Sequence, residues 1–280
     1  MAIDWEVEYN NRARVPEHPE IFARWQSEAA AYRAATTAQG RAEIGVKYGP
    51  SPRQTIDLFK PRGGDKSAPV AMFVHGGYWR SLEPATFSQM ARGMNAHGIT
   101  VAVSGYDLCP QVSIRQIIEQ TQAACLLLWK RFGRRIMVSG HSAGGHLAAC
   151  MVATDWKTLD ASAPADLVPA GYAISGVHDL APLLHLSGNA EFKLDAAEAR
   201  LISPLFWPVS RGLVLDAVVG GDESSEFLRQ SKIIADDWRQ RGVETRYEVI
   251  SGMNHFTICD AMTNPDSAMT ARLVALTART

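Results

Sequence analysis

Short apolar runs alternate with longer amphipathic stretches over most of this chain. Continuous apolar runs of strand length occupy residues 69–74 and 98–103, and further strands are predicted at 135–139, 170–175, 213–219 and 245–250. Runs of this kind are typical of strands that are buried on both faces. Between two of them, Ser113 and Gln116 have the spacing of a capping box and predict a helix that reaches about Phe132. Alternating strands and helices predict an α/β fold with a mostly parallel central sheet and helices on both faces.

Three regions depart from this alternation. Residues 1–40 are polar and alanine-rich with apolar side chains at helical spacing, which predicts a helical extension packed on a core domain of residues 41–280. Residues 42–48 and 54–59 resemble a hairpin at a sheet edge. Residues 178–211 combine prolines with large apolar side chains, which suits either a lid-like insertion beside a pocket or an ordinary packed excursion.

Composition narrows the function classes. The chain has 280 residues, 46% of them hydrophobic, and a formal net charge of −1, so nucleic acid is not an expected partner. Its four scattered cysteines predict neither a disulfide framework nor a zinc site, and no cofactor is expected. The N-terminus lacks the features of a signal peptide, and no apolar run approaches the roughly 18 residues of a membrane span. We expect a cytoplasmic protein with a small-molecule substrate, and we leave a homodimer open.

The strongest chemical signal is Gly140-His141-Ser142-Ala143-Gly144, between an apolar strand and an alanine-rich helical run. A G-x-S-x-G sequence at a strand–turn–helix junction raises the serine hydroxyl clear of the sheet. Ser142 is therefore the predicted nucleophile. The alternative, a serine that only caps the following helix, would need no catalytic partners elsewhere in the chain.

A serine hydroxyl needs a base to accept its proton and a carboxylate to orient that base. In open α/β sheets these groups follow the carboxyl ends of strands. His255, just past the last predicted strand, is the predicted base, and Asp222, at the end of the run 213–219, is the predicted acid. Asp179 is the rival acid, although we interpret it as a helix cap, and Glu223 is a weaker neighbour.

The oxyanion of a tetrahedral intermediate needs hydrogen-bond donors. The backbone N–H of Ala143, next to the nucleophile, is one predicted donor. The turn after the strand at 69–74 supplies the others from Gly76 and Gly77, where a side chain would block approach to the substrate. We expect His75 to brace this turn by hydrogen bonding rather than to act in catalysis.

These motifs resemble those of a known superfamily. His75–Trp79, Gly140–Leu147, Ser175–Leu180 and Asn254–Phe256 are similar to the α/β-hydrolases, most closely to the branch of kynurenine formamidases (arylformamidases) and small esterases. The resemblance covers roughly residues 40–278 and implies a metal-free Ser-Asp-His hydrolase of esters or activated amides. Lipase-like relatives often have His-Gly-Gly-Gly at the oxyanion turn, whereas here Tyr78 takes the place of the third glycine, as in formamidases.

Aromatic residues near the predicted site suggest the substrate. Tyr78 and Trp79 follow the oxyanion glycines, Phe206 and Trp207 lie in the insertion, and we predict that these four residues and His178 bind substrate. Aromatic rings pack well on a flat ring, so we expect an aryl ester or aryl formamide with a short acyl group. The bland alternative is that Trp79 and Trp207 are core residues.

Other functions remain compatible with the fold. One is a catalytically inactive small-molecule receptor, which would be expected to lose Ser142 or His255. Another is a short-chain carboxylesterase without aromatic preference. A third is a cofactor-free haloperoxidase- or dehalogenase-like enzyme, but a dehalogenase would carry an aspartate in place of Ser142.

Overall fold

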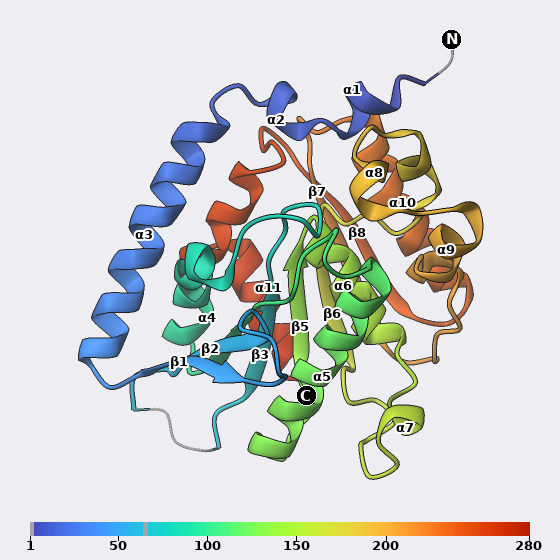
Figure 1. Cartoon of the computed structure of the whole chain (residues 1–280). Coiled ribbons are helices and arrows are strands. Elements are labelled where there is room, and N and C mark those ends of the chain that lie inside the picture. Colours follow the sequence, from blue (N-terminus) through green and yellow to red (C-terminus); the bar gives the residue numbers. More distant parts are fainter. Residues whose placement is uncertain (1–2, 64–66) are drawn as a thin grey trace.

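The computed structural model of the protein describes residues 3–63 and 67–280. Eight strands form one sheet in the order β1-β2-β4-β3-β5-β6-β7-β8 (Figure 1). Pairing is antiparallel between β1 and β2 and between β2 and β4, and parallel throughout the rest of the sheet. The strands are β1 (Ala42–Lys47), β2 (Thr55–Phe59), β3 (Val70–Val74), β4 (Thr100–Ser104), β5 (Met137–His141), β6 (Ala170–Ile174), β7 (Val214–Gly220) and β8 (Glu244–Ile250).

Helices connect the parallel strands and cover both faces of the sheet. The α-helices are α1 (Trp5–Tyr9), α2 (Asn11–Arg14), α3 (His18–Ala38), α4 (Arg92–Ala96), α5 (Ile114–Phe132), α6 (Ala143–Ala153), α7 (Trp156–Leu159), α8 (Asn189–Phe192), α9 (Ala196–Leu201), α10 (Ser225–Gln240) and α11 (Ala268–Thr277). The 3₁₀ helices are η1 (Pro84–Ala91), η2 (Ala181–His185), η3 (Pro204–Phe206) and η4 (Thr257–Thr263). This architecture confirms the predicted α/β fold with a mostly parallel sheet.

Alternation along the strands divides the core into two layers, because successive side chains of a strand point to opposite faces. On β3, Met72 and Val74 belong to the layer that contains buried residues of α5, α6 and α10. Ala71 and Phe73 belong to the opposite layer, with buried residues of α3, α4 and α11. Both layers are needed because β3 is buried along its whole length.

Local sequence signals account for the best predicted helix. Helix α5 begins after Ser113, whose side chain accepts from the backbone of Gln116, and the Gln116 side chain accepts from the backbone of Ser113. The predicted capping box is therefore confirmed. The helix ends at Gly133, which has a left-handed φ of 65° that glycine adopts readily.

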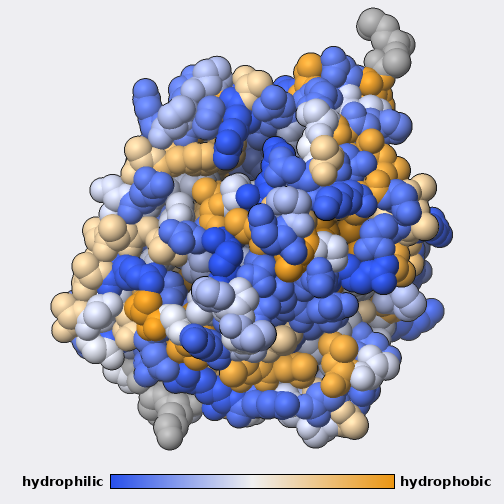
Figure 2. All heavy atoms as spheres, in the orientation of Figure 1, coloured by the Kyte–Doolittle hydropathy of each residue, from blue (hydrophilic) through white to orange (hydrophobic). Residues whose placement is uncertain are grey.

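Most of the surface in view is hydrophilic, with apolar atoms in separate patches (Figure 2). Large apolar side chains that are more than one-third exposed are scattered over the chain, among them Val7 on α1, Leu201 on α9 and Val249 on β8. Scattered exposed apolar residues are normal on a protein surface. Within the described ranges, no helix combines the length and the apolar character needed to cross a bilayer.

Candidate active site

Ser142 lies at a sharp turn between β5 and α6. Its φ of 56° and ψ of −116° are outside the usual regions for a residue with a side chain, as expected for a serine at this kind of strand–helix junction. The side chain of Ser142 makes no capping hydrogen bond to α6. The helix-cap alternative is therefore wrong, and the hydroxyl is left available for chemistry.

The two glycines of the motif allow this turn to form. A Cβ atom on Gly140 would lie 2.1 Å from the carbonyl oxygen of Gly144, and one on Gly144 would lie 1.9 Å from the carbonyl oxygen of Val74. Both distances are far below van der Waals contact with rigid backbone. The close approach of β5, α6 and β3 at the turn therefore requires glycine at both positions.

His255 meets a carboxylate, but not the predicted one. Its Nδ1 is 2.6 Å from Oε2 of Glu223, and both side chains are almost completely buried. Because the acceptor is a carboxylate, Nδ1 carries the proton and Nε2 is left as the acceptor nitrogen. The prediction of Asp222 is wrong: that residue is exposed, and its backbone N–H donates to the carbonyl of Met253.

The turn after β7 explains why Glu223, rather than Asp222, contacts His255. Strand β7 continues to Gly220, and the Glu223 backbone N–H donates back to the Gly220 carbonyl. This turn directs Asp222 outward and returns the longer side chain of Glu223 toward His255. The rival Asp179 instead accepts a hydrogen bond from the backbone N–H of Ala181. The N-cap of η2 is Leu180 and no side chain caps that helix, so the predicted capping role of Asp179 is wrong.

His141, between Gly140 and Ser142, contacts His255 directly. Its Nε2 is 2.7 Å from the backbone carbonyl oxygen of His255, and the two ring centroids are 4.7 Å apart. Burial, with the nearby His255 as a second cause, lowers the pKa of His141 well below its ordinary value. A neutral His141 therefore donates from Nε2 and holds the main chain of His255, a role that its sequence position alone did not reveal.

The glycine turn after β3 lies against Ser142. A Cβ atom on Gly76 would come within 3.1 Å of the Ser142 Cβ, and Gly77 has a φ of 112°. In the described part of the chain, the backbone N–H groups of Gly76, Gly77 and Ala143 donate to no other group. They are therefore available to an oxyanion beside Ser142.

The side chain of His75 contacts the backbone of the glycine turn after β3. Its Nδ1 is 2.7 Å from the Gly76 carbonyl oxygen, and its ring stacks on Tyr106 with centroids 4.4 Å apart. Complete burial lowers the pKa of His75 to about 4, so the ring is neutral at neutral pH. The expectation that His75 braces the turn agrees with this geometry.

A cavity of about 510 Å³ opens over Ser142 and His255. Its walls come from the N-terminal helices, the oxyanion turn and the stretch that follows it, the insertion, and the loop after β8. The lining includes Tyr9, Asn11, Phe22, Trp25, Gly77, Tyr78, Arg80, Phe87, His141, Ser142, Leu186, Glu191, Phe192, His255 and Phe256. Many of the side chains that line the cavity are thus aromatic, and the 178–211 segment contributes one of its walls.

Among the predicted substrate-binding residues, Tyr78 lies in this cavity. Trp79 does not: it is 1% exposed and its ring packs edge-on against His146 and Phe192, so the core alternative holds. The prediction that Phe206 and Trp207 bind substrate is also wrong, because both residues line a separate cavity with Arg115 and Leu201.

The prediction that His178 binds substrate is also wrong. It is completely buried and is not among the residues that line the Ser142 cavity, and neither ring nitrogen has a partner within the described residues. Burial, followed by the nearby His146, lowers the pKa of His178 to about 3. It is a neutral core histidine.

Comparisons with known proteins agree with this geometry. Residues 71–258 match the model of a family described by the α/β-hydrolase fold. The chain belongs to the α/β-hydrolase family. This hydrolase is 29% identical over 249 residues to kynurenine formamidase from Drosophila melanogaster, with 84% of this chain and 81% of the relative covered. It is 25% identical over 238 residues to kynurenine formamidase from Danio rerio, with coverages of 82% and 80%.

A solved structure extends the likeness over nearly the whole chain. A protein from Silicibacter sp. TM1040 that carries a provisional thioesterase name superimposes on this hydrolase with a TM-score of 0.87. The two are 31% identical, and the match covers 96% of this chain and 98% of the other. The likeness to kynurenine formamidases and the α/β-hydrolase fold, both expected from the motifs, are confirmed.

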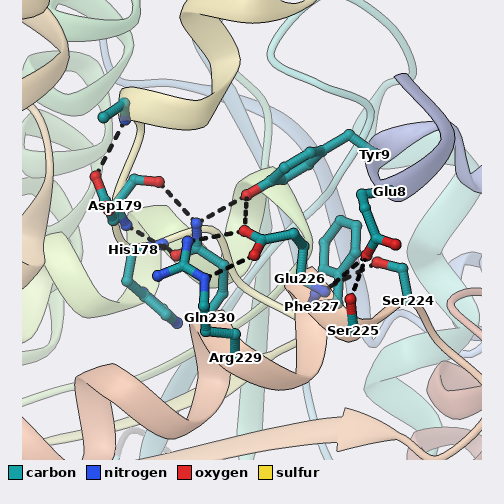
Figure 3. Close-up of polar contacts among 11 residues, drawn as sticks. Glu8, Tyr9, His178, Asp179, Ser224, Ser225, Glu226, Phe227, Arg229 and Gln230 are labelled. Carbon is teal, nitrogen blue, oxygen red and sulfur yellow. Dashed lines mark hydrogen bonds and ion pairs between the residues drawn. The ribbon is translucent and has the colours of Figure 1, made fainter. Parts of the chain in front are cut away.

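The N-terminal segment of this hydrolase is tied to the rest of the site by polar contacts (Figure 3). The Tyr9 hydroxyl donates to Oε2 of Glu226 at 3.1 Å and accepts from Nε2 of Gln230 at 2.9 Å. Oε2 of Glu8 accepts from the Ser225 hydroxyl and the Glu226 backbone at the start of α10. Tyr78 also donates its hydroxyl to the Tyr9 carbonyl. Helix α1 therefore links the oxyanion turn to the helix that follows Glu223.

Gln230 completes this cluster on its other side. Its Oε1 accepts from the backbone N–H groups of His178 and Asp179 at 2.8 and 2.9 Å, and its Nε2 also donates to the Asp179 carbonyl at 2.7 Å (Figure 3). The start of the insertion is thereby fastened to α10. Helical spacing in residues 1–40 indicated packing on the core, but no sequence signal indicated these partners.

Across residues 3–63 and 67–280, no group of three or more His, Cys, Asp or Glu side chains is arranged to hold a metal ion.

Proposed function

We propose that this chain is a serine hydrolase that cleaves a small ester or activated amide through an acyl-enzyme intermediate. The observation that carries the proposal is the contact between Glu223 and Nδ1 of His255, because His255 lines the same cavity as Ser142. A buried carboxylate that orients a histidine beside a serine in a strained turn is the arrangement that activates a serine hydroxyl.

The reaction follows from these positions. Oγ of Ser142 attacks the carbonyl carbon while its proton passes to Nε2 of His255, and the negative charge develops on the carbonyl oxygen. The N–H groups of Gly76, Gly77 and Ala143 stabilise that oxygen. The intermediate collapses when His255 returns the proton to the departing alcohol or amine. Water then attacks the acyl-enzyme by the same route, releasing the acid and restoring Ser142.

We further propose that the substrate is an aryl ester or aryl formamide with a short acyl group. The aromatic rings of Tyr78, Phe192 and Phe256 line the cavity, and such rings pack well against a flat aromatic group. The kynurenine formamidase name of the relatives supports an aryl formamide. The proposed aromatic preference therefore rests on Tyr78, which was predicted from the sequence, and on Phe192 and Phe256, which were not.

The nucleophile is tested with Ser142→Ala. Removing the hydroxyl eliminates the acyl-enzyme, so we expect kcat to fall by roughly 10⁴–10⁶ while the protein stays folded. Mass spectrometry should find a fluorophosphonate probe attached to Ser142 of the wild type and no labelling of the variant. Activity of the variant within tenfold of wild type would remove Ser142 from the mechanism, and an unlabelled wild type would favour an inactive receptor.

A substrate panel tests the aromatic preference. We expect kcat/KM for aryl acetates and aryl formamides to exceed that for octanoate esters by at least about tenfold, or roughly 1.4 kcal/mol of transition-state binding. An acyl thioester belongs in the same panel because of the Silicibacter protein's name. If octanoate or longer aliphatic esters are better substrates, the proposed aromatic preference is wrong.

A further inference from the structure

Ser175, the residue that follows β6, has a backbone conformation that side chains disfavour. Its φ is 51°, it is fully buried, and its N–H donates to the Val218 carbonyl at 2.7 Å. Glycine adopts such a left-handed conformation with much less strain. A serine at this position therefore suggests a task for its hydroxyl.

The hydroxyl of Ser175 meets the carboxylate that orients the base. Its Oγ lies 2.5 Å from Oε1 of Glu223, and the same oxygen accepts from the Gly220 backbone N–H at 2.8 Å. The other oxygen, Oε2, faces Nδ1 of His255 at 2.6 Å. Three donors thus fix both oxygens of one buried carboxylate.

We propose that Ser175 is a positioning residue of the active site, acting on His255 through Glu223. The inference rests on the proposed serine-hydrolase function. A glutamate side chain has one more rotatable bond than aspartate, so its carboxylate needs an anchor beyond the backbone to hold one orientation. With Ser175 and Gly220 on Oε1, Oε2 is directed at Nδ1 of His255, and Nε2 is kept as the nitrogen that accepts the Ser142 proton.

The hydroxyl also moderates the charge of the carboxylate. A hydrogen bond to a carboxylate favours its ionised form and draws charge away from the oxygen that faces the histidine. Without that bond, Glu223 attracts a proton on His255 more strongly. The base would then become available only at higher pH, and its orientation would be less fixed.

Two substitutions separate the hydroxyl from the backbone. Ser175→Ala removes the hydroxyl and keeps a Cβ in the left-handed conformation. Ser175→Gly removes the hydroxyl and relieves the conformation. Ser104→Ala is the matched control, because Ser104 is a buried serine at the end of β4 whose hydroxyl donates to the Gly105 carbonyl.

The measurement is the second-order rate constant for fluorophosphonate labelling of Ser142 between about pH 5.5 and 8.5, which needs no knowledge of the natural substrate. We expect both Ser175 variants to label at least tenfold more slowly than wild type, with the midpoint of the acid limb moved up by about half a pH unit. Ser104→Ala should label at the wild-type rate. In a Glu223→Gln background, Ser175→Ala should cause less than a threefold further loss, because the two residues act as a unit.

The outcomes distinguish this inference from the proposed function. A wild type that is not labelled contradicts the serine-hydrolase proposal itself. A labelled wild type with Ser175 variants of unchanged rate and unchanged midpoint overturns only the role of Ser175. Recovery of the wild-type rate in Ser175→Gly, equal losses with and without Glu223→Gln, or failure of both Ser175 variants to fold would show a structural role and would also overturn it.

Discussion

At the scale of single residues, the choice of acid shows where sequence reasoning ends. Ser142 and His255 could be located because each follows a recognisable strand, within motifs whose chemistry is specific. Asp222 and Glu223 are adjacent acids after the same strand, and nothing in their order tells which one turns inward. The turn in which the Glu223 backbone N–H donates to the Gly220 carbonyl determines which of the two side chains faces His255.

The corrected acid can be tested directly. Glu223→Gln should lower kcat by roughly 10³–10⁴, because an amide can no longer fix the tautomer of His255 and stabilise its charged form. Asp222→Asn is the matched control and should keep kcat/KM for an aryl ester within threefold of wild type, because its side chain is exposed. The opposite order of sensitivities would return the role to Asp222.

At the scale of elements, buried strands were the most predictable part of the chain. Each of the eight strands coincides with a segment predicted as a strand from the sequence. Strands β3 to β7 are buried along their whole length, and a strand covered on both faces is mostly apolar, whereas the edge strands β1 and β8 are partly exposed. Contacts between elements were less predictable. Phe206 and Trp207 have the composition of a pocket wall, yet η3 places them at another cavity.

The attachment of the insertion to α10 can be measured as stability. Gln230→Met should leave the backbone N–H groups of His178 and Asp179 without their acceptor, at a cost of roughly 2–5 kcal/mol in the free energy of unfolding. Gln240→Met, at the exposed end of the same helix, should change it by less than about 0.5 kcal/mol. Urea denaturation measures both, and equal effects would show that the Gln230 contacts contribute little.

At the scale of the whole molecule, four buried histidines make stability depend on pH. Burial lowers the pKa of His75 and His146 to about 4, that of His178 to about 3, and that of His141 well below its ordinary value. Because these values lie below the ordinary histidine value of about 6.5, the unfolded chain takes up protons first as the pH falls. The stability that the neutral rings contribute is complete above about pH 6.5 and is lost progressively toward pH 4.

We therefore expect the free energy of unfolding to fall by on the order of 4 kcal/mol per pH unit between pH 6 and 5. Urea denaturation at pH 7.5, 6.0, 5.5 and 5.0 measures this slope. In His178→Leu, which replaces a ring without partners for its nitrogens, the slope should fall by about one-quarter. A stability that is constant from pH 7.5 to 5.0 would contradict the neutral state of these histidines.

The division of the cavity along the chain has a consequence for divergence among relatives. Ser142, Glu223 and His255 all lie within the matched family region, residues 71–258, whereas Tyr9, Phe22 and the rest of the N-terminal wall precede it. The N-terminal part of the cavity wall and the residues proposed to perform the chemistry can thus accumulate substitutions under separate constraints. Exchange of the first 40 residues between two relatives would transplant that wall and leave the reaction centre intact where the contacts of Glu8 and Tyr9 with Tyr78 and α10 are kept. Selectivity in this architecture can therefore evolve faster than mechanism.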